Sequence, residues 1–171
     1  MSDEYTHIIS RDGTLQPLCV ATINPYQYFG LDTRFDIDLQ QLELAYLRVQ
    51  ALVHPDNHVN MGEASATNAI NHTIYCNDSY QQLSDPFTRG KILLRLVNYD
   101  YGDDDKAVQP AKTFLLEIME LEADLATNKP LIADKFKQCC ADIAQAFSTE
   151  DYACMSTRLI EVQYYARLLQ L

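Results

Sequence analysis

The sequence lacks tryptophan, has only 5 glycines and 6 prolines among 171 residues, and holds no long apolar run. So few glycines and prolines do not favour a turn-rich β protein, and no run approaches the ~20 residues of a membrane helix. Basic residues are also scarce, because 13 Lys and Arg stand against 24 Asp and Glu, for a net charge of -11. Nucleic acids and anionic membranes bind basic surfaces, so we expect neither as a partner.

The five cysteines are odd in number and include no C-x-x-C pair. This usage suggests neither a disulfide framework nor a zinc site, and we expect a reducing compartment with no metal or cofactor. The opening MSDEYTHIISRDG has no basic start followed by an apolar stretch, so we expect no secretory signal.

A first long helix is predicted to start after Asp38, a candidate N-cap with Gln41 at the capping-box position. The helix should end at His54, because the residue before Pro55 is pushed out of the helical region. Its apolar stripe repeats at steps of 3 and 4 and consists of Leu39, Leu42, Tyr46, Val49 and Val53.

The spacing predicts a second helix from about Glu63 to Ser84, with one face made of Ala66, Ile70, Ile74 and Asn77. Asp85-Pro86 resembles an N-cap followed by a proline at the first position of a third helix. Three further stripes follow, at 114–125, 132–147 and 152–169, and Asn128-Lys129-Pro130 is expected to end the first of these helices. Three amphipathic helices with short breaks predict an antiparallel bundle, and the fold class is all-α.

The chain divides into four predicted parts. Residues 1–23 have no sustained period and read as an irregular N-terminal extension, and residues 24–98 and 112–171 are helical in pattern. Residues 99–111 between them are predicted to be an acidic linker. Asp103-Asp104-Asp105 within it could bind a cation, but a solvated linker is the preferred interpretation.

The tripeptide His54-Pro55-Asp56 lies between two predicted helices. Histidine can donate and accept hydrogen bonds, aspartate can accept a bidentate arginine, and proline restricts the geometry between them, so the loop is a recognition candidate. Two alternatives stay open. Pro55 could simply end a helix, with His54 and Asp56 capping and solvating the loop. His54, Asp56 and His58 could also bind a metal, as in a metal-dependent enzyme.

The surrounding motifs resemble the J domain, the module that activates heat-shock ATPase chaperones of the DnaK type. Tyr26-x-Tyr28-Phe29-Gly30-Leu31 opens the unit, and Asp85-Pro86-x-x-Arg89 follows its second long helix. The stretches SDPFTRGKILLRLVNYD and FLLEIMEL extend the resemblance to the HscB family, the J-type co-chaperones of iron–sulfur cluster biogenesis.

This resemblance implies an N-terminal J-domain helical hairpin within 24–98 that stimulates the ATPase of an HscA/DnaK-type chaperone and does no chemistry itself. The implied contacts to that chaperone are His54, Pro55, Asp56, Arg48 and Asn57. The 112–171 bundle would bind IscU, the scaffold protein on which the cluster is built. The implied scaffold contacts are Leu115, Leu116, Met119, Glu120 and Tyr164.

The residues themselves support a second binding surface. The helix that carries the core stripe Phe114, Ile118, Leu121 and Leu125 has an offset apolar set, Leu115, Leu116 and Met119, edged by Glu120 and Asp124. A bundle needs one apolar face from each helix, so the surplus face is a candidate partner site. The alternative is that these residues fill a wide bundle core.

Several positions depart from the family pattern. Asn57 stands where the family commonly has Lys, Arg48 is the only basic residue between Leu39 and His54, and Ala123 and Thr127 replace frequent charged contacts. Less positive charge should slow association with an acidic partner. A J-like interaction protein that binds a scaffold without stimulating an ATPase therefore remains an alternative. The extension lacks the paired C-x-x-C motifs of some eukaryotic members, which favours a bacterial-type cytoplasmic protein.

Overall fold

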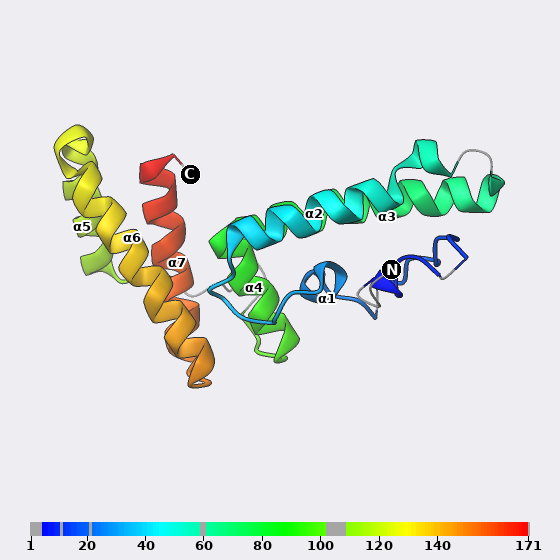
Figure 1. Cartoon of the computed structure of the whole chain (residues 1–171). Coiled ribbons are helices and arrows are strands. Elements are labelled where there is room, and N and C mark those ends of the chain that lie inside the picture. Colours follow the sequence, from blue (N-terminus) through cyan, green and yellow to red (C-terminus); the bar gives the residue numbers. More distant parts are fainter. Residues whose placement is uncertain (1–4, 11, 21, 59–60, 102–108, 171) are drawn as a thin grey trace. The chain divides into compact units, whose positions relative to one another are not determined.

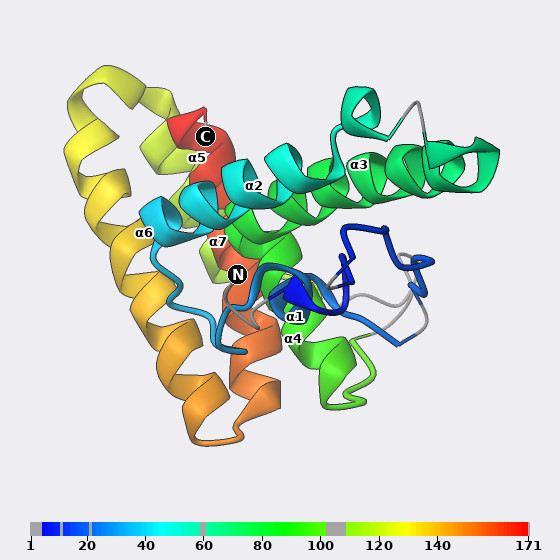
Figure 2. The ribbon, with the colours of Figure 1, turned by 45° about the vertical axis from the view of Figure 1, so that its right-hand side comes forward.

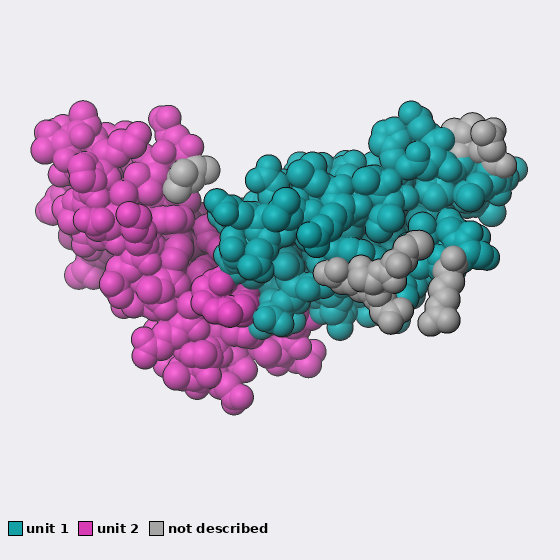
Figure 3. All heavy atoms as spheres, viewed as in Figure 1, with its two compact units in different colours: residues 1–33, 37–85 teal, residues 34–36, 86–171 magenta. Residues whose placement is uncertain are grey.

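The computed structural model describes residues 5–10, 12–20, 22–58, 61–101 and 109–170. Within these ranges all the regular secondary-structure elements are helices, and the only β pairing is a single bridge between Ile9 and Leu15 (Figures 1 and 2). The all-α prediction is therefore confirmed. None of the described helices is long and apolar enough to cross a membrane. The chain forms two compact units, one from residues 1–33 with 37–85 and the other from 34–36 with 86–171 (Figure 3).

The helices of the first unit are α1 (Pro25–Phe29), α2 (Leu39–Val53), the 3-10 turn η2 (Pro55–Asn57) and α3 (Glu63–Ser84). Short polar side chains cap the N-termini of α1 and α2. Asn24 and Gln27 form a reciprocal capping box at α1. The carboxylate of Asp38 accepts hydrogen bonds from the backbone of Gln40 and Gln41, at 2.8 and 3.4 Å, which confirms the predicted cap of α2.

α2 and α3 pack side by side as a helical hairpin. The face of α2 that is turned inward consists of Leu42, Ala45, Val49 and Val53. A polar seam runs along one edge of the pair. The Gln50 side-chain amide and the Tyr46 hydroxyl both donate to Oδ1 of Asn77, at 2.6 and 3.1 Å.

The predicted bounds of α3 are confirmed, but its predicted inner face is wrong. Ile70 and Ile74 are exposed. The buried positions are instead Ser65, Ala69, His72, Cys76, Ser79 and Leu83. A polar residue can be buried when its hydrogen bonds are satisfied. His72 meets this condition, because its two ring nitrogens contact the Gln16 carbonyl and the Tyr28 hydroxyl at 2.8 and 3.1 Å.

The described part of the N-terminal extension is packed against this hairpin. Ile8 and Leu15 are buried. The Nε2–H group of His72 donates to the Gln16 carbonyl, and the Tyr75 hydroxyl donates to the Ile23 carbonyl at 2.8 Å. The segment is irregular as predicted, yet its backbone carbonyls are bound by α3.

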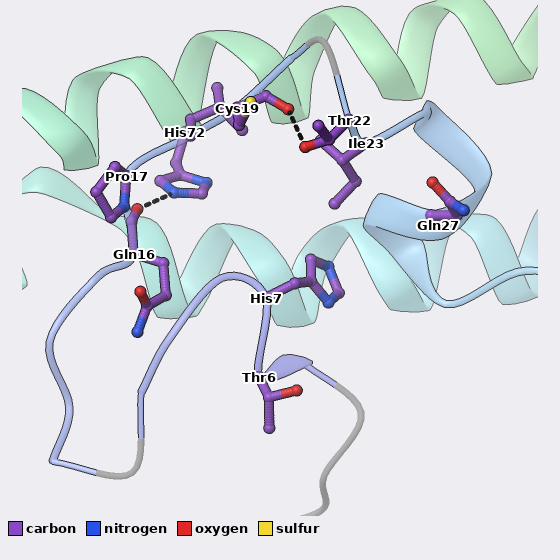
Figure 4. Close-up of a pocket in the computed structure, with 10 residues that line it drawn as sticks. Thr6, His7, Gln16, Pro17, Cys19, Thr22, Ile23, Gln27 and His72 are labelled. Carbon is purple, nitrogen blue, oxygen red and sulfur yellow. Dashed lines mark hydrogen bonds between the residues drawn. The ribbon is translucent and has the colours of Figure 1, made fainter.

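A hollow of about 570 Å³ lies along the seam between this extension, α1 and α3. Figure 4 shows His72 reaching into it from α3, with His7 on the other side. Burial lowers the pKa of His72, with a smaller contribution from the nearby rings of His7 and His58. The neutral ring is therefore the form that holds the extension.

The helices of the second unit are α4 (Pro86–Leu96), α5 (Lys112–Ala123), α6 (Leu125–Ser148) and α7 (Tyr152–Leu169). α6 and α7 form a long antiparallel pair, α5 packs on α6, and α4 packs on α7. The bundle predicted at 112–171 is therefore present with α4 added. Gly90 of α4 lies directly against the side chain of Leu159 on α7.

α4 falls within the J domain predicted at 24–98, but it belongs to the second compact unit. The Arg89 guanidinium lies 4.9 Å from the centre of the Phe35 ring, which places residues 34–36 in the same unit. Pro86 begins α4 as predicted. The functional limits of the predicted domains stay a prediction, and Asp103-Asp104-Asp105 lie outside the described residues.

The expectation that Asn128-Lys129-Pro130 ends a helix is wrong. α5 ends at Ala123, and Pro130 lies inside α6. The carboxylate of Asp124 caps the new helix by accepting from the Thr127 amide at 3.3 Å, so the chain turns before the proline. Pro130 is the sixth residue of α6, so its missing N–H removes one backbone hydrogen bond in the second turn, and the rest of the 24-residue helix keeps its bonding pattern. Leu125 accordingly belongs to α6 and not to the stripe of α5.

Replacement of Gly90 by Ala should destabilise the second unit. The new methyl group would collide with the buried Leu159 side chain. Overpacking of this kind costs about 1–3 kcal/mol, and the better helix propensity of Ala returns at most about 1 kcal/mol. Urea unfolding should show a net loss, which Leu159→Val in the same chain should partly restore. A rise in stability for Gly90→Ala alone would contradict this packing.

Acid should weaken the first unit through His72. Its folded-state pKa is lowered from 6.5, so as the pH falls through 6.5 the unfolded chain takes up a proton that the folded chain does not. Stability is therefore fully present above this pH and decreases below it, by up to about 1.4 kcal/mol per unit of pKa difference. Urea unfolding at pH 7.5 and 5.5 should show a smaller decrease for His72→Gln, which keeps a donor for Gln16 without titrating. Equal decreases would contradict this role.

Candidate functional site

The loop after α2 owes its shape to Pro55. His54 has φ -55° and ψ 126°, because a residue before proline avoids the helical region, and α2 therefore ends at Val53. The chain at once makes the 3-10 turn η2, in which the amides of Asn57 and His58 donate to the carbonyls of His54 and Pro55 at 3.0 and 2.9 Å. Two backbone hydrogen bonds thus hold a turn of three residues.

Side chains complete the turn. Nδ1 of His54 accepts from the Asp56 amide at 3.3 Å, so the neutral ring carries its proton on Nε2. The side chains of His54 and Asp56 are 53% and 86% exposed, and Nδ1 lies 3.7 Å from a carboxylate oxygen of Asp56. The loop therefore presents one imidazole and one carboxylate next to each other at the surface.

His58 faces the opposite way from these two residues. It is buried, and its Nε2–H group donates to the Leu52 carbonyl at 2.9 Å. A metal site built from His54, Asp56 and His58 would need all three to converge on one point. That arrangement is absent, and the described residues contain no cluster of three metal-ligating side chains. The metal-enzyme alternative is not supported by this geometry.

The cysteines offer no reactive cluster either. The described thiols are all free. Burial raises the pKa of Cys76 and of Cys139 to about 12, so both stay protonated at neutral pH. Cys139 donates to the Arg158 carbonyl at 3.2 Å, which is consistent with a packing role.

The two further residues predicted to contact a chaperone differ in their availability. Arg48 is exposed on α2. Asn57 is also exposed, but its side-chain amide donates to the Ala51 carbonyl at 3.0 Å and so ties the turn back to α2. The asparagine thus stabilises the loop, and its side chain is less available to a partner than the sequence suggested.

Two leucines beside the loop were not singled out from the sequence. Leu44 and Leu47 lie on the outer side of α2 and are strongly exposed. The signal that could have found them is their spacing, since Leu47 precedes His54 by two helical turns.

The second predicted surface lies on α5. Phe114, Ile118 and Leu121 are buried, which confirms these members of its core stripe. Leu116 and Met119 are 52% and 65% exposed. The offset set is therefore mostly outside the core.

The other residues predicted for this surface are less uniform. Leu115 is half-buried and Glu120 is exposed. Tyr164 is half-buried on α7, where its ring centre lies 5.6 Å from that of Phe114 and 5.1 Å from the Arg167 guanidinium. Tyr164 thus contacts α5 through a core residue.

Two carboxylates of α5 differ in their contacts. Glu117 accepts from Lys135 of α6 at 2.8 Å and from the Tyr165 hydroxyl of α7 at 3.3 Å. Burial and this carboxylate raise the pKa of Tyr165, which remains a neutral donor. Glu117 therefore joins the three helices, whereas Glu120 borders the exposed apolar residues.

The curated proteins and the solved structures that are similar to this chain have the same name, HscB. No protein-family model matches the chain. Curated proteins called "Co-chaperone protein HscB homolog" do match. The one from Bordetella petrii is 30% identical over 163 residues, which cover 88% of this chain and 95% of the relative. Those from Paraburkholderia phymatum and Colwellia psychrerythraea are 36% and 32% identical, over only 58% and 56% of their own lengths.

Solved structures share the fold. The crystal structure of human co-chaperone protein HscB matches with a TM-score of 0.82 and 22% identity, over 95% of this chain and 87% of the human chain. The chaperone HscB from Vibrio cholerae matches with a TM-score of 0.75 and 23% identity, over 86% and 94% of the two chains.

Proposed function

This chain belongs to the HscB co-chaperone family, and we propose that it stimulates the ATPase of an HscA/DnaK-type chaperone and delivers an IscU-type scaffold protein to it. Its role in the cell would be to assist the assembly or transfer of iron–sulfur clusters. We propose no catalytic chemistry of its own. The free thiols of the described residues fit a reducing compartment, which supports the cytoplasm as the site of action.

The observation that carries this proposal is the exposed His54-Pro55-Asp56 turn. Asp56 can accept an arginine in two parallel hydrogen bonds, and Nε2 of His54 can donate to an acceptor beside it. The turn is already ordered by the His54 and Asn57 contacts. A partner that binds it therefore has little loop entropy to overcome.

Delivery requires a second, separate surface, which α5 supplies. Leu116 and Met119 are exposed apolar side chains, and Glu120 follows Met119 directly and Leu116 by one helical turn. Such a patch, apolar with an acidic border, suits a protein partner that offers apolar and basic groups. The patch lies on the second compact unit and shares no residue with the loop.

A J-like protein that binds a scaffold without stimulating an ATPase is the second candidate. It is favoured by the engaged side chain of Asn57 and by Arg48 as the only basic residue of α2. The two candidates differ in one measurable property, which is stimulation of ATP hydrolysis.

His54→Gln should abolish stimulation of the partner ATPase. The change removes the ring and the Nδ1 acceptor that orders Asp56. Single-turnover ATP hydrolysis by the cognate ATPase chaperone should then be stimulated at least about tenfold less. Circular dichroism and scaffold binding should match the parent. Parent-like stimulation by this variant would show that the loop has another role.

Leu116→Ala combined with Met119→Ala should weaken scaffold binding about tenfold or more, because two exposed apolar contacts are lost. Isothermal titration with an IscU-type scaffold measures this effect. ATPase stimulation without scaffold should not change. Ile70→Ala, an equally exposed apolar change on the first unit, is the control and should bind normally. If the double variant also bound normally, the scaffold surface would lie elsewhere.

A further inference from the structure

Three of the four histidines join one segment of the first unit to another through the same ring nitrogen. In each, the Nε2–H group donates to a backbone carbonyl. The pairs are His7 with Tyr28 at 3.3 Å, His58 with Leu52 at 2.9 Å, and His72 with Gln16 at 2.8 Å. These hydrogen bonds join the N-terminal extension to α1, the loop to α2, and α3 to the extension. Because a neutral imidazole carries one N–H group, Nδ1 of each neutral ring is unprotonated.

A second proton on these rings would go to Nδ1, which lies in buried surroundings in two of them. His72 is 1% exposed, and its Nδ1 lies 3.1 Å from the Tyr28 hydroxyl, which can donate to it. His58 is 3% exposed, and its Nδ1 has no hydrogen-bond partner among the residues that the structure describes. Burial of a charge or of an unpaired donor is destabilising. The observed packing therefore suits neutral rings.

The three rings also act on one another. Burial lowers the pKa of His72 most, and the nearby His7 and His58 lower it further. A charge on one ring of the group thus opposes a charge on His72. The other titratable groups of this cluster stay neutral, because burial raises the pKa of Tyr28, Tyr75 and Cys76.

α3 connects the extension to the base of the loop. Residue 72 binds the extension, and the next residue, Thr73, has its hydroxyl 3.4 Å from the carbonyl of Val53, directly before His54. His7 and His72 line the open hollow between the extension, α1 and α3 (Figure 4). Water in this hollow can exchange protons with both rings.

We propose that His7, His58 and His72 form a proton-sensitive latch, which holds the extension and the recognition loop on the hairpin while the rings are neutral and releases both when the rings are protonated. Each proton taken up on opening favours the open state about tenfold per unit of falling pH below about 6.5. In mild acid the extension and the loop therefore open together more often. The latch is a property of the chain alone, so its tests need no ATPase chaperone and can succeed or fail independently of the proposed function.

Hydrogen exchange of backbone amides in the full chain measures the latch. The Gln16 amide donates to the Ile8 carbonyl at 2.8 Å within the extension, and the Asn57 amide donates to the His54 carbonyl at 3.0 Å within the loop. The protection factors of both amides, corrected for intrinsic exchange, should fall at least about tenfold from pH 7.5 to 5.5. Amides of the second unit, whose sequence contains no histidine, should change less than about threefold. Equal changes in the two units would overturn the proposal.

Single substitutions test whether the two segments share one latch. His7→Gln, His58→Gln and His72→Gln each keep a side-chain donor but cannot titrate. Each variant should reduce the pH-dependent loss of protection at both the Gln16 and the Asn57 amides. If each variant changed only the amide of its own segment, the shared latch would be overturned.

Tyr75→Phe is the matched control. It removes the hydroxyl that donates to the Ile23 carbonyl at 2.8 Å, which is a contact to the extension that stays neutral in this pH range. Protection of the Gln16 amide should fall by a similar factor at both pH values, and its pH dependence should match that of the parent. A pH dependence reduced as much as in His72→Gln would indicate simple loosening without proton uptake and would overturn the proposal.

Discussion

The peptide unit between His54 and Pro55 is the constraint on which the rest of the site depends. It ends α2, and the turn that follows is closed by backbone hydrogen bonds from Asn57 and His58. The same turn exposes His54 and Asp56 and directs His58 inward to the Leu52 carbonyl. A proline at this position therefore separates one outward-facing pair of polar groups from a buried histidine that holds the loop.

The two faces of α2 have different environments. Its inner face is a continuous apolar contact with α3, and its outer face carries Leu44 and Leu47 toward the loop. The hairpin is further held by the N-terminal extension through His72 and Tyr75. The loop thus lies at the end of a packed hairpin, and this order would reduce the entropy lost on binding a partner.

The helix bounds could be predicted from the sequence where the apolar period and the capping or proline residues agree. Asp38 and Pro55 bracket α2, and both bounds of α3 were predictable. The inner face of α3 was not, because the buried His72 depends on Gln16 and Tyr28, which are distant in sequence. The prediction at Pro130 was wrong for a different, local reason, since the Asp124 cap allowed a helix to begin before the proline. The loop and the α5 surface were recognisable from local motifs, whereas the bond from Asn57 to Ala51 required three-dimensional structure.

Two non-overlapping surfaces on one chain are the central claim, and chemical-shift mapping tests it most directly. The isotopically labelled 19.5 kDa chain would be titrated separately with the ATPase chaperone and with an IscU-type scaffold. The account predicts that the chaperone perturbs amides from Arg48 to His58 and that the scaffold perturbs amides around Leu116 and Met119. If both partners perturbed the same amides, or if the chaperone left the loop unchanged, the account would be contradicted.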